Sequence, residues 1–271
     1  MTPSPREIAT RLGIDQRPLA QRVYRAVAFQ RYFARGYRFG EHFPPGATVP
    51  AAERTRSDLE QYAESHTDGP GIFKWQHYFD IYDRHLSRLR GAPVTLVEIG
   101  VAGGGSLGMW REYLGSQAQI VGIDIDPDCK RFEQEQIEVV IGDQGSAEFW
   151  DAFLHAHERI DIVIDDGGHL PEQQAVTLES LLPRIAPGGV FICEDIHGPF
   201  QPFHAYVDGL TRPLSSIGFA GETYPAGSLQ RQVASVHRYP LVTVIEKTTA
   251  TPASFEARRH GTQWPKDWVR S

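Results

Sequence analysis

From Val94 onward, short runs of β-branched and apolar residues alternate with amphipathic helical segments. This alternation is typical of a parallel sheet that helices cover on both faces. The expected strands are Val94–Ile99, Ile120–Ile125, Glu138–Ile141, Ile160–Ile164 and Val190–Cys193. Two further runs, Val233–Tyr239 and Leu241–Lys247, are separated by one proline and predict a terminal antiparallel pair. The predicted fold class is therefore α/β, with a doubly wound, mostly parallel sheet of seven strands.

The chain before the first expected strand has helical periodicity instead. Apolar residues recur at three- and four-residue steps from Ile8 to Phe29, and Phe33 and Tyr37 continue the stripe. A turn-rich break at residues 42–46 precedes a second helical stretch that ends near Leu89. We expect an N-terminal helical cap or lid over residues 1–90, the sheet domain over residues 91–248 and a C-terminal tail over residues 249–271.

Composition narrows the class of protein. Hydrophobic residues make up 41% and charged residues 23% of the 271 residues, as in a folded domain, and no stretch approaches the ~18 apolar residues of a membrane span. The N-terminus lacks the apolar region of a secretory signal, and the only cysteines, Cys129 and Cys193, make no disulfide framework. The formal charge of −7 argues against a nucleic-acid partner. We expect a cytoplasmic protein with a small-molecule ligand.

A glycine-rich turn follows the first expected strand at residues 100–105, where the backbone can approach a ligand closely. A dinucleotide fingerprint would need glycine at position 102, but Ala102 stands there, which disfavours NAD. Asp124 ends the second strand, where a carboxylate can accept the hydroxyl protons of a ribose. Asp143 and Gln144 follow the third strand and suit an adenine edge. These groups lie at the carboxyl ends of the strands, where open α/β sheets bind ligands.

Acidic side chains and a histidine follow the fourth and fifth expected strands. Asp166 comes after one strand, and Glu194 and Asp195 come after the next. Carboxylate oxygens converging from neighbouring strands suit Mg²⁺ or Mn²⁺, whereas zinc is disfavoured because His and Cys at its usual spacing are missing. His169, three residues past Asp166, is close enough to accept a proton from a hydroxyl group that the cation holds. The pattern predicts a metal site beside a general base.

The glycine turn and the acidic strand ends resemble the nucleoside-binding residues of class I S-adenosylmethionine-dependent methyltransferases, which have a Rossmann-like sheet. The resemblance implies S-adenosylmethionine as cofactor, with Asp165 facing its methionine end. The expected cofactor-binding residues are Glu98, Gly100, Gly104, Ser106, Asp124, Asp126, Asp143, Gln144 and Asp165.

A narrower resemblance covers residues 67–200. The segments at residues 165–169, 187–189 and 194–195 read Asp-Asp-Gly-Gly-His, Pro-Gly-Gly and Glu-Asp. In this order they resemble the metal-dependent sugar O-methyltransferases of macrolide and rhamnosyl tailoring, in the cephalosporin hydroxylase-like group. The resemblance implies that Asp166, Glu194 and Asp195 carry the metal and that His169 is the base. It also implies a glycosylated or polyhydroxylated small-molecule substrate and antibiotic biosynthesis. Separately, the N-terminal helical segment could be an oligomer surface, and we expect a homo-oligomer. Gly168 stands where the group has serine, and His197 has no counterpart.

Other interpretations remain open from the sequence. A catechol-type O-methyltransferase would use the same cation chemistry, and a non-catalytic cofactor-binding module or an NAD-linked oxidoreductase would use the same fold. The acids could be helix caps and His169 a structural loop residue. His197 could be an acid/base group, a metal ligand or a solvated loop residue. Residues 66–78, polar and aromatic with glycines, could form a lid over the ligand or an ordinary connection.

Overall fold

The computed structural model describes residues 19–46, 55–215, 223–225, 228–256 and 260–263. The chain divides into two compact units, Met1–Thr55 and Arg56–Ser271. In the first unit, helix α2 spans Leu19–Glu41 and confirms the helical periodicity predicted there. Ile8, where the predicted stripe begins, lies outside the described residues.

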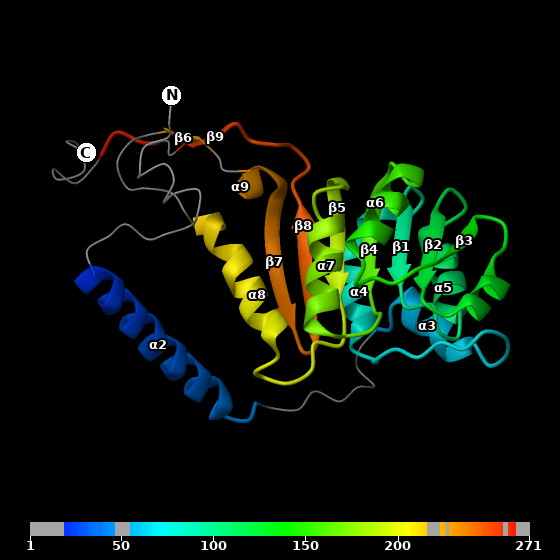
Figure 1. The fold of residues 1–271 in the computed structure, drawn as a ribbon, viewed down its shortest axis with the longest axis horizontal. Helices are drawn as coiled ribbons and strands as arrows, with labels where there is room; N and C mark the ends of the chain where they lie inside the picture. The colour runs from blue at the N-terminus through cyan, green and yellow to red at the C-terminus, as the bar shows by residue number, and fades with distance from the viewer. Residues whose placement is uncertain (1–18, 47–54, 216–222, 226–227, 257–259, 264–271) are drawn as a thin grey trace. The chain divides into compact units, whose positions relative to one another are not determined.

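The second unit is built on a seven-stranded sheet with the order β3-β2-β1-β4-β5-β8-β7 (Figure 1). Neighbouring strands from β3 to β5 run parallel, and β8 is antiparallel to both of its neighbours. The strands are β1 Thr95–Ile99, β2 Gln119–Asp124, β3 Ile137–Ile141, β4 Ile160–Asp165, β5 Ile185–Cys193, β7 Val233–Tyr239 and β8 Val242–Lys247. The prediction of a mostly parallel Rossmann-like sheet that closes on antiparallel pairing is confirmed.

The helices and remaining elements follow the sequence signals at their ends. Ser57 and Ser146 cap α3 and α6 through their side-chain oxygens, and prolines occupy the first turns of α7 and α8. The helices are α3 Asp58–Ser65, α4 Tyr78–Leu86, η2 Ser87–Leu89, α5 Gly105–Leu114, η3 Pro127–Phe132, α6 Ala147–Ala156, α7 Pro171–Leu181, α8 Pro202–Thr211, η4 Arg212–Ser215 and α9 Ser228–Gln232. The short strands β6 Thr223–Pro225 and β9 Ser254–Glu256 pair separately from the main sheet.

Two hydrophobic clusters fill the two faces of the sheet, because successive side chains of a strand point to opposite sides. Leu96 of β1 belongs to the cluster under α3, α4 and α5, whereas Val97 and Ile99 belong to the cluster under α6, α7 and α8 (Figure 1). Glu98, in step with Leu96, therefore points to the side of α4 and α5, where it is fully buried. This alternation places one acidic side chain inside the molecule, beneath the end of the sheet that bears the site.

Candidate active site

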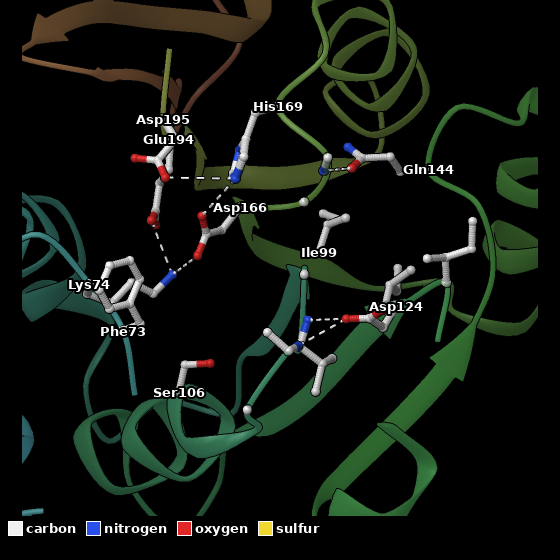
Figure 2. A pocket seen from close by; sticks show the side chains of 18 of the residues that line it. Phe73, Lys74, Ile99, Ser106, Asp124, Gln144, Asp166, His169, Glu194 and Asp195 are labelled. Carbon is white, nitrogen blue, oxygen red and sulfur yellow. Dashed lines mark hydrogen bonds and ion pairs between the residues drawn. The ribbon is translucent and has the colours of Figure 1, made fainter. Parts of the chain in front are cut away.

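A cavity of about 590 Å³ opens at the carboxyl ends of β1 to β5 (Figure 2). Nine of the residues predicted for the site line it: Gly100, Ser106, Asp124, Asp143, Gln144, Asp166, His169, Glu194 and Asp195. The segment at residues 71–75 and Tyr78 line it as well. Four predicted cofactor residues lie outside the lining: Glu98, Gly104, Asp126 and Asp165. Strand ends far apart in sequence thus meet where sheet topology predicts a ligand site.

The glycine-rich turn and Asp124 form one side of the cavity. Gly100 has φ +91°, and a Cβ atom there would lie 2.1 Å from the carbonyl oxygen of Asp166, so the position accepts only glycine. Oδ2 of Asp124 accepts hydrogen bonds from the backbone N–H groups of Val101 and Ala102, at 2.8 and 3.0 Å. Burial raises the pKa of Asp124, but backbone hydrogen bonds outweigh it, so the pKa lies below its usual value. Asp124 is therefore an ionised carboxylate that also fixes the turn.

Three of the predicted cofactor residues outside the lining have internal partners. Glu98 is fully buried and accepts a 2.7 Å hydrogen bond from the hydroxyl group of Ser106. Gly104, with φ +77°, is the N-cap residue before α5 and packs on the ring of Phe132. Asp126 is exposed and caps η3. Of these three residues, Glu98 bonds Ser106, which lines the cavity, and the other two stand at the N-termini of neighbouring helices.

Gln144 connects the loops that follow β3 and β4. Its Nε2 donates to Oδ1 of Asp165 at 2.9 Å and to Thr177 Oγ1 at 3.1 Å, and its Oε1 accepts from the backbone N–H group of Gly168 at 2.6 Å. Asp165 is buried, and this burial raises its pKa to about 6. The side chain of Gln144 thus sets the backbone of the loop that carries His169.

Two of the predicted metal ligands, Asp166 and Glu194, and the buried Glu98 surround a lysine that the sequence interpretation did not single out. The ammonium group of Lys74 lies 2.7 Å from Oδ2 of Asp166 and 3.1 Å from Oε2 of Glu194 (Figure 2). It also lies 3.3 Å from Oε1 of Glu98. Its side chain is 3% exposed. Burial lowers the pKa of Lys74, but the three carboxylates outweigh it, and the net shift is strongly upward. Lys74 is therefore a permanent positive charge among the acids.

Two tyrosines one helical turn apart on α4 each bond one oxygen of a predicted metal ligand. Tyr82 donates to Oε1 of Glu194 at 2.6 Å, and Tyr78 donates to Oδ1 of Asp195 at 2.6 Å. The indole N–H of Trp75 also donates to Oδ1 of Asp195, at 3.0 Å. Burial raises the pKa of Glu194, and the nearby Lys74 opposes that rise. The four-residue spacing of the tyrosines was the available signal, because it puts both on one face of a predicted helix.

His169 completes the cluster from the loop after β4, with a left-handed φ of +56°. Its Nε2 lies 3.8 Å from Oδ2 of Asp195 and 4.0 Å from Oδ1 of Asp166 (Figure 2). One ligand atom each of Asp166, His169 and Asp195 lies within 4.8 Å of the others, a spacing that suits a cation. His197 is 57% exposed, with Nε2 3.8 Å from Oδ1 of Asp195. The arrangement offers a hard cation two carboxylates and an imidazole, while Glu194 is held by Lys74 and Tyr82.

Known proteins resemble this chain in sequence and in structure. Residues 97–196 match the family model described as "Methyltransferase domain". Over 90% of its length the chain is 30% identical to the 8-demethyl-8-alpha-L-rhamnosyl tetracenomycin-C 2'-O-methyltransferase of Streptomyces olivaceus, and it spans 72% of that relative. The chain belongs to this methyltransferase family. The predicted recognition, fold and enzyme class are thereby confirmed, and the oxidoreductase and binding-module interpretations are not favoured.

Other relatives are also named as O-methyltransferases. The methyltransferase is 31% identical to the mycinamicin VI 2''-O-methyltransferase of Micromonospora griseorubida over 65% of its own length and 49% of the relative. Its structure resembles that of MycE methyltransferase from the mycinamycin biosynthetic pathway, in complex with Mg, SAH and mycinamycin VI, at a TM-score of 0.61 and 27% identity. That likeness covers 71% of this chain and 54% of the other. The methyltransferase thus spans about half the length of these two relatives.

Among the residues that the structure describes, no helix combines the length and apolar character needed to cross a bilayer.

Proposed function

We propose that this methyltransferase transfers a methyl group from S-adenosylmethionine to a sugar hydroxyl group of a glycosylated small molecule. The observation that carries the proposal is that Asp166 and Asp195 converge beside His169, next to the glycine turn. Relatives at 30 and 31% identity are named for sugar hydroxyl groups of natural products, which supports antibiotic biosynthesis as the setting. Catechol methylation uses similar cation chemistry but has no support among these relatives.

The residues fit the cofactor that we propose. Gly100 leaves room for close approach at the turn, and the lowered pKa of Asp124 keeps a carboxylate ready for ribose hydroxyl groups. Ser106, Asp143 and Gln144 line the same cavity. Glu98, Gly104, Asp126 and Asp165 support it from behind or beside the lining. S-adenosylmethionine supplies an activated methyl group, and the chain's part is to orient it.

The donor set fits Mg²⁺ or Mn²⁺, because oxygen ligands predominate. We propose Asp166, Glu194 and Asp195 as the ligands. A divalent ion there supplies positive charge that lowers the pKa of a nearby hydroxyl group. His169 faces Asp166 and Asp195 across the cavity and would take the proton of the acceptor hydroxyl at Nε2. The acids and the imidazole would thus orient the acceptor and remove its proton.

The experiment that tests this function is a substrate panel with purified protein, S-adenosylmethionine and Mg²⁺. Rhamnosylated polyketides, macrolide glycosides and catechols are incubated in parallel, and products are detected by mass spectrometry. We expect a mass gain of one methyl group on the glycosides and none on the matched aglycones. Turnover of catechols without turnover of any glycoside would refute the sugar assignment.

We also propose a homo-oligomer in the cytoplasm. The support for association is α2, which exposes Phe33 and Phe39 at 48 and 66% of their surfaces, an apolar display that a second copy could cover. The support for a reducing compartment is that Cys129 and Cys193 are both free and buried. Light scattering on the purified protein would show a monomer if the association is wrong.

A further inference from the structure

Lys74 is one of four lysines in the chain. Its ammonium group lies among three carboxylates, where a positive charge is expected. It contacts acids that follow two different strands, Asp166 after β4 and Glu194 after β5, and a third acid within β1. Its side chain is nearly inaccessible, at 3% exposure. An ion pair of an exposed lysine contributes little to stability, because water screens the charges. A buried lysine interacts strongly with the acids around it, and its removal leaves buried charges without a partner.

The oxygen atoms of the acids are divided between Lys74 and His169. Oε2 of Glu194 and Oδ2 of Asp166 face Lys74, and the other oxygen of Glu194 accepts from Tyr82. Oδ1 of Asp166 and Oδ2 of Asp195 face His169. With Lys74 in place, Glu194 has no oxygen turned to a second cation.

An ammonium group and a divalent ion cannot share these oxygens at close range. Mg²⁺ binds carboxylate oxygens at about 2.0–2.1 Å, and Lys74 contacts them at 2.7 and 3.1 Å, so both would place like charges within a few ångströms in a buried site. The stem of lysine is flexible, with four methylene groups, and can withdraw. The neighbouring Phe73 is 94% exposed, so no packing of that ring holds the segment down.

We propose that Lys74 is the internal occupant of the metal site, and that it competes with the divalent ion for Asp166 and Glu194. An ion that uses Glu194 as a ligand enters only as the ammonium group withdraws. Without an ion, Lys74 keeps the acids together and prevents the repulsion that would separate them. The inference rests on the proposed metal-assisted function, but its tests measure metal binding and lysine exposure rather than turnover.

The first test compares Mn²⁺ affinity, measured at pH 8 by titration calorimetry, of the wild type, Lys74→Met and Lys130→Met. Lys130 is a matched control, because its exposed side chain pairs with Glu133 and the substitution changes the net charge equally. We expect Lys74→Met to bind Mn²⁺ at least tenfold more tightly than the wild type, and Lys130→Met to stay within threefold. Unchanged or weaker binding by Lys74→Met, with SAH affinity retained as evidence of folding, would overturn the competition.

The second test uses the wild type alone, so it holds even if Lys74→Met fails to fold. An acetylating N-hydroxysuccinimide ester modifies accessible lysines, and mass spectrometry measures each site. Lys130 is an exposed reference and Lys247 a buried one, since the ammonium group of Lys247 is bonded to Leu182 O and Gln232 Oε1. We expect Lys74 to match Lys247 without metal, and its labelling to rise at least tenfold with saturating Mn²⁺.

Either test can overturn the proposal by itself. Persistent protection of Lys74 at saturating Mn²⁺, or no Mn²⁺ binding by either the wild type or Lys74→Met, would overturn it. Failure of the proposed function looks different: tighter Mn²⁺ binding by Lys74→Met and metal-dependent labelling, without methylation of any glycoside, would defeat the sugar assignment and leave the competition standing.

Discussion

The hydroxyl group of Tyr82 is a single buried atom whose removal has a calculable effect. Tyr82 is fully buried, and it donates a 2.6 Å hydrogen bond to Oε1 of Glu194, whose side chain is 1% exposed. The substitution Tyr82→Phe keeps the ring, which packs edge-to-face on Trp110 with centroids 4.9 Å apart. The loss is therefore confined to one hydrogen bond and to one buried acceptor that lacks a donor.

A hydrogen bond to a charged partner contributes about 1.5–3 kcal/mol, and an unsatisfied buried acceptor costs a similar amount. We expect Tyr82→Phe to lower the free energy of unfolding of the sheet unit by about 2 kcal/mol. The matched control is Tyr206→Phe, which removes a 3.0 Å hydrogen bond to the exposed Glu179. Its expected cost is at most about 0.5 kcal/mol, because both groups can bond to water instead.

The assay is urea denaturation of both variants and the wild type, monitored by circular dichroism. The buffer contains a chelator and no cofactor. At an unchanged slope, the midpoint shift gives the difference in free energy. Equal effects of Tyr82→Phe and Tyr206→Phe would refute the reasoning, since they would mean that burial of the acid does not raise the importance of its donor.

Three further predictions concern the site itself. Asp166→Asn should abolish turnover while the SAH dissociation constant stays within threefold of the wild-type value. Calorimetry with SAH checks this, and a loss of SAH affinity together with activity would contradict it. His169→Ala should lower kcat roughly 10²–10⁴-fold, the range of general-base catalysis, with Mn²⁺ still bound, whereas a loss under threefold assigns it to structure. The pKa of Asp124 is lower in the folded state than in the unfolded state, so its ionised form stabilises the fold at pH values above the unfolded-state pKa. This stabilisation is lost as the pH falls through the folded-state pKa. Denaturation of Asp124→Asn between pH 5 and pH 3 should therefore show its deficit against the wild type shrinking, and a constant deficit would contradict this.

The central strands were predictable because their β-branched runs are buried on both faces. β7 has the predicted bounds, and β1 and β2 agree within one residue at either end. β5 differs, since it begins at Ile185 rather than Val190. Glycines and a proline in between indicate a turn, but the backbone there continues along β4 with a shift of register between Ile160 and Ile162.

The acids and His169 were predictable as a cluster, because carboxyl ends of parallel strands meet at one edge. Lys74 was not, since its partners Asp166 and Glu194 lie 92 and 120 residues away, and no local periodicity encodes such a contact. The tight hold of Asp124 on the turn was also missed. Its backbone partners depend on the left-handed conformation of Ala102, with φ +46°, which alanine rarely adopts.

The side-chain amide of Gln144 supports the loop that carries His169. Because its oxygen bonds the backbone one residue before His169, and its nitrogen bonds Asp165 and Thr177, the amide cannot rotate without breaking contacts on both sides. A ligand that displaces the neighbouring Asp143 would therefore also displace the backbone beside the imidazole of His169. In the proposed function, one amide would thus link the cofactor side of the cavity to the proposed base.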